Sequence, residues 1–407
     1  MRALGTDAMG LYISVPFCRS KCTYCNFASG VYPASEHARY VERLVQEMEA
    51  APAWAEGFGV HLPRVVDTVY LGGGTPSLLE PQWFDRLFSA IRHQFCLAPE
   101  AEITVECAPG QLPDATLAAM VAAGVNRVSL GVQSLVDREA QVSGRLHTRA
   151  IVLKDLDRLR RAGVHNVNLD LIAGLAGQTT ASWDESLAAL FETGVPHASI
   201  YMLEVDEDSR LGRELLSGGA RYFAELVPTD DAIAQMYETA LDQLEEAGLR
   251  QYEISNFARP GYTSQHNLRY WQRRPYLGLG LDASSALYAR QQDDFGAPGS
   301  LPFLLRTKTT EDLKDYLAGS ELAEFTWLSV ERQLEEAWFL GLRLTEGVDV
   351  DALRRQFGPE PIAQTLMRVD HLVADGLLES DSQRVWLNRR GRLLSNEVFQ
   401  EFLFELV

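Results

Sequence analysis

Three cysteines stand close together near the N-terminus, in the segment CRSKCTYC at residues 18–25. They are separated by three and then by two residues, and they follow the apolar run 11–15, which predicts a strand. The loop therefore lies at the carboxyl end of a strand, where active sites form in (β/α) barrels. Thiolates are the usual ligands of iron–sulfur clusters. We expect Cys18, Cys22 and Cys25 to bind a [4Fe–4S] cluster and to leave one iron without a ligand from this loop.

Two other interpretations of the loop remain open, a zinc site and chance clustering. Zinc sites usually pair two Cys-x-x-Cys units or add nearby histidines, and no such second half follows here. Cys96, in a stretch with helical periodicity, and Cys107, after a separate strand, could supply a fourth cluster ligand. We expect both to be plain buried thiols instead.

Polar residues mark the ends of several other predicted strands. Gly73, Gly74 and Thr75 close the second strand, and glycine lets a backbone approach a ligand closely, although a tight turn would use it too. The later strands contribute Glu106, Gln133 and Asp170. A carboxylate in an apolar strand is costly unless it is paired or faces a polar cavity. If the three side chains face one polar cavity, the polar groups of all three are satisfied. The alternative is that each forms a hydrogen bond with a nearby loop. Arg145 is a candidate partner for a carboxylate, unless it is a solvated surface arginine.

Strand and helix patterns alternate through the first two-thirds of the chain. The strand-like runs are 11–15, 66–71, 102–106, 126–132, 166–172 and 198–203. The amphipathic stretches lie near 36–51, 81–95, 114–123, 148–162, 181–193 and 230–247. Three of them end at glycines typical of helix C-caps, Gly124, Gly163 and Gly248. Repeated units of this kind predict an α/β fold with a parallel sheet and right-handed crossovers. Because they are fewer than the units of a closed barrel, we expect a partial, open (β/α)6-type barrel.

The pattern changes near residue 290, where QQDDFGAPGS is polar and rich in turn residues. We expect a barrel domain at 1–290, a linker at 291–309 and a small domain at 310–407. The last part is mostly helical, and LVADGLLES followed by RVWLNRRGRLL predicts a helix, a strand and a hairpin. The C-terminal domain is therefore expected to be winged-helix-like.

Charge and composition narrow the possible functions. The 407 residues carry a formal charge of −19, which disfavours broad binding to nucleic-acid phosphates. Five cysteines are too few for a disulfide scaffold, and their clustering favours a metal site in a reducing compartment. The N-terminal residues lack the pattern of a signal peptide, and no apolar run is long enough to span a bilayer. We expect a cytoplasmic protein.

The Cys-x3-Cys-x2-Cys loop after the first strand resembles the signature of the radical S-adenosylmethionine superfamily. There the open iron chelates the methionine amine and carboxylate, and one electron from the cluster cleaves the sulfonium to a 5′-deoxyadenosyl radical. The segments TPS, TVECAP, NRVSLGVQSL, GRLHT and NLDLIAGLAGQT are similar to its coproporphyrinogen-III-oxidase-like family over nearly the whole chain. The resemblance implies that S-adenosylmethionine contacts Tyr12, Gly73, Gly74, Thr75, Glu106, Gln133, Arg145 and Asp170, and that Tyr24 lines the site.

Two features separate the branches of this family. The oxygen-independent oxidases carry a further cysteine two residues after the third, where this chain has Phe27. CRSKCTYCNF and the HNLRYW segment at 266–271 resemble the heme-chaperone branch, HemW. Imidazole is a good axial ligand of heme iron, so His266 is a candidate heme residue; a packed corner with a satisfied imidazole is the alternative. Ala108 and the stretch 280–285 depart from the family pattern, which leaves the surroundings of Glu106 and any heme role of that stretch open.

The resemblance implies a heme chaperone that carries a [4Fe–4S] cluster, exchangeable S-adenosylmethionine and heme. Its partners would be a heme-acceptor protein and an electron donor such as flavodoxin or ferredoxin, with peripheral membrane contact through the acceptor and no nucleic acid. An oxygen-independent coproporphyrinogen III oxidase, or another radical enzyme acting on a tetrapyrrole, is the alternative.

Overall fold

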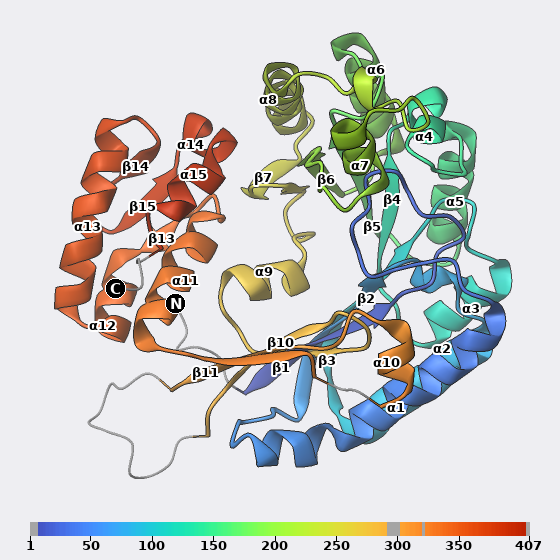
Figure 1. Ribbon diagram of the computed structural model, residues 1–407, viewed down its shortest axis with the longest axis horizontal. Helices are drawn as coiled ribbons and strands as arrows, with labels where there is room; N and C mark the ends of the chain where they lie inside the picture. The colour runs from blue at the N-terminus through green and yellow to red at the C-terminus, as the bar shows by residue number, and fades with distance from the viewer. Residues whose placement is uncertain (1–6, 291–301, 320–321, 404–407) are drawn as a thin grey trace.

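A twelve-stranded sheet forms the centre of the protein, as a computed structural model of residues 7–290, 302–319 and 322–403 describes it (Figure 1). The strands lie in the order β12-β11-β10-β9-β1-β2-β3-β4-β5-β6-β8-β7. Their bounds are β1 Ala8–Val15, β2 Val65–Gly73, β3 Cys96–Cys107, β4 Arg127–Gln133, β5 Asn166–Ala173, β6 His197–Met202, β7 Arg250–Glu253, β8 Asn256–Ala258, β9 Tyr276–Leu279, β10 Ser284–Tyr288, β11 Leu304–Lys308 and β12 Glu324–Leu328.

The centre of this sheet is parallel and its two ends are antiparallel. Strand β9 and the strands β1 to β6 run in one direction, whereas β10 to β12 and the β7–β8 pair are antiparallel to their neighbours. The edge strands β12 and β7 are not paired with each other in the described part of the chain, so the barrel is open as predicted. In the register, Glu106 lies opposite Ser129 and Gly131 opposite Asp170. The carboxyl ends of these strands therefore lie at one edge, where they can share a site.

The helices lie outside the parallel strands, and in Figure 1 they form an arc that opens toward the C-terminal domain. Their bounds are α1 Ala34–Gly57, η1 Pro76–Leu78, α2 Pro81–Gln94, α3 Asp114–Ala122, α4 Asp137–Val142, α5 Arg149–Arg161, α6 Thr180–Thr193, α7 Arg210–Ser217, η2 Ala224–Leu226 and α8 Asp230–Glu246. The predicted caps are confirmed, because φ is +91° at Gly124, +87° at Gly163 and +78° at Gly248. Helix α9, Gln265–Trp271, lies inside the arc instead.

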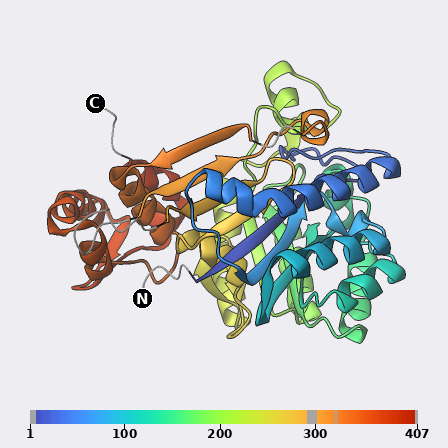
Figure 2. The same ribbon diagram turned by 90° about the horizontal axis from the view of Figure 1, so that it is seen from below.

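The C-terminal residues form a second unit with its own apolar core, in which Trp338 stacks on Phe402. Its elements are α11 Val330–Leu342, β13 Val348–Asp349, α12 Val350–Phe357, α13 Pro359–Ala374, β14 Leu378–Ser380, β15 Arg384–Leu387, α14 Arg389–Leu393 and α15 Ser395–Gln400. The predicted hairpin is β14 and β15. Figure 2 shows these helices at one end of the molecule. Ile254, in the turn after β7, belongs to the same core and joins the two units.

Strands β11 and β12 and the short helix α10, Leu313–Leu317, lie between these units in the chain. Residues 304–308, expected in the linker, form β11 and extend the large sheet, while 291–301 lie outside the described residues. We keep the division into 1–290, 291–309 and 310–407 as a proposal. No helix in the described part of the chain has the length and apolar content that spanning a membrane requires.

Candidate functional site

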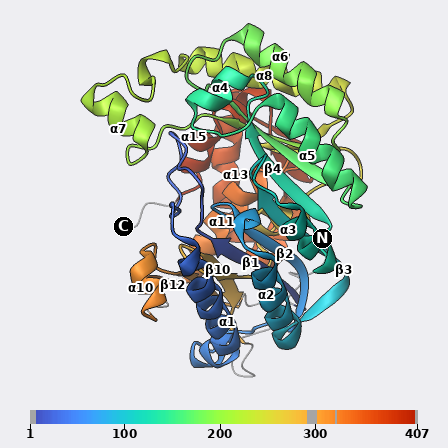
Figure 3. The ribbon, with the colours of Figure 1, turned by 90° about the vertical axis from the view of Figure 1, so that its right-hand side faces the viewer.

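The cluster loop, residues 16–30, follows β1 and carries Cys18, Cys22 and Cys25. The Lys21 ammonium donates hydrogen bonds to the carbonyl oxygens of Phe27 and Ser29, at 2.9 and 3.2 Å. Two other segments hold the loop from outside: the Thr23 amide donates to the Ser143 carbonyl, and the Leu211 amide donates to the Thr23 carbonyl. Figure 3 shows the loop rising beside α4 and α7. The loop is therefore fixed in shape by contacts that do not involve its thiols.

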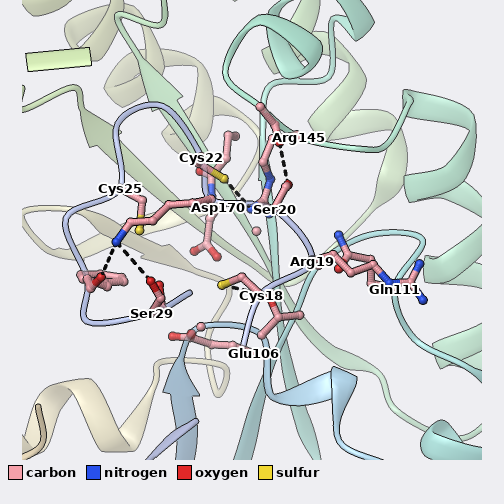
Figure 4. A pocket seen from close by; sticks show the side chains of 18 of the residues that line it. Cys18, Arg19, Ser20, Cys22, Cys25, Ser29, Glu106, Gln111, Arg145 and Asp170 are labelled. Atoms are coloured by element: carbon pink, nitrogen blue, oxygen red, sulfur yellow. Dashed lines mark hydrogen bonds between the residues drawn. The ribbon is translucent and has the colours of Figure 1, made fainter. Parts of the chain in front are cut away.

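The three thiols face a cavity of about 330 Å³ at the carboxyl ends of the strands (Figure 4). The Thr75 hydroxyl lies 3.9 Å from the Cys18 sulfur, and a guanidinium nitrogen of Arg145 lies 3.5 Å from the Cys22 sulfur. Burial raises the pKa of the Cys18 thiol and so favours its protonated form. Metal binding reverses this preference, because ligating thiols are deprotonated. In the described residues, no three or more His, Cys, Asp and Glu side chains lie close enough together to hold a single metal ion. A cluster differs from a single ion in taking its thiolates on separate irons.

The glycine run at the end of β2 packs directly against the start of the cluster loop. A Cβ atom added to Gly74 would lie 2.8 Å from backbone atoms of Val15, Pro16 and Phe17. Gly73 has φ of +100°, which other residues rarely adopt, and its N–H donates to Glu106. The backbones of β2 and the loop can approach this closely only because both positions lack a side chain.

Glu106, at the end of β3, is held in the cavity wall by two donors. The Tyr70 hydroxyl donates to its Oε1 at 2.9 Å, and the Gly73 N–H donates to its Oε2 at 3.2 Å. Burial raises the pKa of this carboxyl to about 7, although both hydrogen bonds favour the charged form. Glu106 therefore changes charge near neutral pH.

Asp170, on β5, is the second carboxylate in the cavity. The Ser129 hydroxyl and the Asn168 amide donate to its two oxygens at 3.0 and 2.7 Å. Burial raises the pKa of Asp170 too, and these donors oppose that effect. The buried carboxylate is thus partly satisfied by a hydroxyl on the neighbouring strand β4 and by an amide on its own strand.

Gln133 ends β4 in a strained position. Its φ is +71°, which is uncommon outside glycine. Its Oε1 atom is buried, and no donor in the described part of the chain reaches it. A Cβ on Gly131, two residues before Gln133, would lie 2.6 Å from Arg145 and 3.2 Å from the Gln133 amide nitrogen. The chain thus brings an unpaired acceptor and a guanidinium to one side of the cavity, where a ligand can complete the hydrogen bond.

All the predicted site residues line this cavity except Tyr12 and His266. Those two lie beneath it: the Tyr70 ring stacks 6.1 Å from the Tyr12 ring and 5.1 Å from His266. Both imidazole nitrogens are bonded, to the Thr68 hydroxyl at 2.9 Å and the Tyr270 hydroxyl at 2.8 Å. Burial lowers the pKa of His266 to about 3, so the ring is neutral. In this arrangement His266 stacks on Tyr70, which lines the cavity.

One of the two remaining cysteines differs from the prediction. Cys96 is exposed and begins β3, because α2 ends at Gln94 and the chain then enters the strand directly. Cys107 is buried, as predicted, but it also lines the cavity. Burial raises the pKa of its thiol to about 12. The expectation of a plain buried thiol was wrong for Cys96.

Three residues that were not predicted complete the cavity: Tyr70, Ser129 and Tyr201. Tyr70 and Ser129 lie on predicted strands, four positions before the identified residues Gly74 and Gln133, whereas no residue near Tyr201 was identified. Since alternate residues of a strand point to the same face, that spacing was the available signal.

The residues present fit an iron–sulfur cluster with S-adenosylmethionine beside it. Three free thiols share one cavity with a close backbone approach at Gly74, an unpaired acceptor at Gln133 and two carboxylates. The carboxylates suit the positive charge of a sulfonium and an amine, and the unpaired acceptor suits a hydrogen-bond donor.

Comparisons with known proteins agree with this arrangement. Residues 12–190 match the family model described as Radical SAM superfamily, and residues 328–394 match the HemN C-terminal domain. The chain is 32% identical to the heme chaperone HemW of Lactococcus lactis, over 97% of each protein, and 30% identical to the heme chaperone HemW of Escherichia coli, over 98% of each. A mouse relative, radical S-adenosyl methionine domain-containing protein 1, is 32% identical over 91% of this chain and 82% of the relative.

The solved structure of the E. coli coproporphyrinogen III oxidase HemN has the same fold. It superposes with a TM-score of 0.80 at 22% identity and covers 98% of this chain and 91% of that chain. The chain belongs to the radical SAM superfamily and, within it, to the coproporphyrinogen-III-oxidase-like family that includes the HemW heme chaperones.

Proposed function

We propose that this protein is a HemW-like heme chaperone, which binds heme and transfers it to an acceptor protein. In this proposal Cys18, Cys22 and Cys25 bind a [4Fe–4S] cluster, and S-adenosylmethionine binds beside it exchangeably. One observation carries the cofactor part: the cavity that holds the three thiols also holds the unpaired acceptor of Gln133. The heme part is supported by full-length relatives that are named heme chaperones.

The cavity residues have distinct roles in the proposal. Gly73, Gly74 and Thr75 offer backbone and hydroxyl groups beside Cys18, where the methionine end of the cofactor would lie. Glu106 and Asp170 supply negative charge, and Gln133 accepts a hydrogen bond. Arg145 stabilises the cluster thiolate nearest to it.

Three aromatic residues support these groups. Tyr24 lines the cavity from within the cluster loop. Tyr70 lines the cavity and stacks on Tyr12 beneath it, and the Tyr70 hydroxyl holds Glu106 in place. For His266 the geometry favours an indirect part in heme function, because Thr68 and Tyr270 occupy both ring nitrogens.

When bound, the cluster and S-adenosylmethionine would supply one-electron chemistry, with flavodoxin or ferredoxin as the electron donor. The chain's own part is to orient the cofactor and to exclude water from it. We also place the protein in the cytoplasm, where thiols stay reduced, with membrane contact only through the acceptor.

Anaerobic titration with heme tests the proposal. Protein reconstituted with iron and sulfide should contain a [4Fe–4S] cluster and should shift the Soret band of heme at micromolar concentration. The same sample should leave coproporphyrinogen III unchanged in the presence of S-adenosylmethionine and a reductant. Catalytic formation of protoporphyrinogen would establish the oxidase instead, and another modified tetrapyrrole would indicate a different radical enzyme.

A further inference from the structure

The mouth of the cofactor cavity carries unusually exposed apolar side chains. Phe27, Leu146 and Tyr201 all line the cavity, and their exposed fractions are 59%, 58% and 39%. Single exposed apolar residues are common on protein surfaces, but several at one opening mark a binding site. These three come from the cluster loop, the segment after α4 and strand β6, so folding brings them together from distant parts of the chain.

A second hollow of about 360 Å³ adjoins this mouth. It shares Tyr24, Cys25, Phe27, Ile172 and Tyr201 with the cofactor cavity. Its further wall is formed by the end of β6 and the residues that follow it, of which Met202, Leu203 and Val205 are apolar and Glu204 and Asp206 are acidic. The mouth therefore leads to a second, partly apolar hollow, and its volume falls in the range of roughly 300–1,000 Å³ that is typical of small-molecule pockets.

Phe27 is held in place although its ring is exposed. Its carbonyl oxygen accepts from the Lys21 ammonium at 2.9 Å, and the neighbouring Asn26 amide donates to Asp206 at 3.0 Å. A ring on a fixed loop loses little conformational entropy when a flat ligand stacks on it. The geometry thus suits a rigid, aromatic ligand.

The rim also offers a positive charge that suits an acidic ligand. Arg19 is exposed, lines the cavity and forms no ion pair with any residue in the described part of the chain. It lies on the other side of the cavity from Cys25 and Ser29 (Figure 4). In a protein with a net charge of −19, an unpaired cation at this rim points to a ligand that brings its own carboxylate.

We propose that the mouth of the cofactor cavity is the heme site, with the porphyrin face on Phe27 and Tyr201 and a propionate at Arg19. The inference rests on the proposed chaperone function and names its binding site. It differs from a site at His266, whose ring is buried beneath the cavity.

The test is a set of heme titrations on anaerobically reconstituted protein, followed at the Soret band. Phe27→Ala should raise the Kd for heme by roughly tenfold, from loss of stacking and of apolar contact. Phe27→Trp keeps a flat face and should bind within about threefold of wild type. Tyr201→Ala tests the contribution of strand β6 to heme binding at the same mouth. Met367→Ala is the matched control, because Met367 is 61% exposed on α13, and it should bind heme as wild type does.

A separate set of titrations tests the proposed contact between Arg19 and a propionate. Arg19→Glu should weaken binding of heme but not of heme dimethyl ester, which lacks free carboxylates. Iron and sulfide are counted in every variant, because Phe27 lies close to Cys25 in the loop. Wild-type heme affinity in Phe27→Ala, Tyr201→Ala and Arg19→Glu would overturn the site and leave the chaperone proposal standing. Failure of the wild-type protein to bind heme would overturn both.

Discussion

The Arg145 guanidinium donates a hydrogen bond to the sulfur of Cys22, with 3.5 Å between Nη1 and Sγ. The same segment approaches the cluster loop through Gly144, where φ is +87° and an added Cβ would lie 3.3 Å from the Cys22 Cα. The segment that follows α4 thus forms one wall of the thiol site. A cation beside a thiolate stabilises the charged sulfur, which is the form that binds iron.

Arg145→Gln should therefore weaken cluster retention. The variant keeps some hydrogen-bonding capacity but loses the charge beside Cys22, so iron should leave faster when a chelator is added anaerobically. We expect the half-life of the cluster absorbance to fall several-fold, with a smaller effect for Arg145→Lys. Arg138→Gln, an exposed arginine on α4, is the control. Equal half-lives in the Arg145 and Arg138 variants would show that the charge does not matter.

Gly74→Ala should damage the site through packing alone. The new Cβ would meet backbone atoms of residues 15–17 at 2.8 Å, and backbone cannot move aside as a flexible side chain can. Overpacking of this kind typically costs about 1–3 kcal/mol of folding free energy. We expect a lower midpoint in urea and a reduced iron content after reconstitution.

Gly57→Ala is the matched control for that substitution. Gly57 ends α1, has open space around its Cα and does not have a positive φ. Alanine there should leave stability unchanged or slightly higher. If Gly74→Ala reached wild-type iron content, the close approach of β2 to the cluster loop would not be needed for the site.

The strand–helix units could be predicted because each carries a local signal. Their parallel strands are buried apolar runs, and their helices have one apolar face and, at three of them, a glycine cap. Strand β12 has no comparable signal, since its residues are almost all exposed and it is held by pairing with β11 at the sheet edge. Long-range pairing of that kind leaves little trace in the local sequence.

The same difference between local sequence signals and long-range contacts applies to the candidate site. The cysteine spacing and the strand-end residues predict which side chains share the cavity, because parallel strands end at one edge. Local patterns do not predict which residues lie behind others. His266 follows β8 in the chain and lies beneath Tyr70 because Glu102 on β3 accepts hydrogen bonds from the backbone amides of Gln265 and His266. That contact joins residues more than 160 positions apart, so no local pattern contains it.

His266→Ala should destabilise the fold without changing the heme spectrum. The substitution leaves the hydroxyls of Thr68 and Tyr270 without their imidazole partner and opens a cavity under Tyr70. Buried losses of this kind cost about 2–4 kcal/mol together. Urea unfolding measures the cost, and the Soret maximum and iron content should stay at their wild-type values. A shifted Soret maximum in a folded variant would instead identify His266 as a heme ligand.

Binding of S-adenosylmethionine should strengthen as pH rises through neutrality, because the pKa of Glu106 lies at about 7. The ionised carboxylate attracts a cationic ligand and the neutral acid does not, so the affinity should rise by up to about tenfold between pH 6 and 8. Equilibrium dialysis on reconstituted protein measures this. The charged or titratable groups that face Glu106 are Tyr12, Tyr70, Cys107, Arg127, Asp170, Tyr201 and Tyr270.

Glu106→Gln should remove this pH dependence and hold the affinity near the low value seen at pH 6. The raised pKa of Glu106 also predicts the direction in which folding stability changes with pH. The folded protein keeps the Glu106 proton up to about pH 7, whereas the unfolded chain releases it near the ordinary value of 4.5. Its contribution to stability is therefore complete below pH 4.5 and is lost as the pH rises through 7. Glu106→Gln should abolish that loss in urea titrations, and an unchanged pH profile for both binding and unfolding would assign the titration to another group.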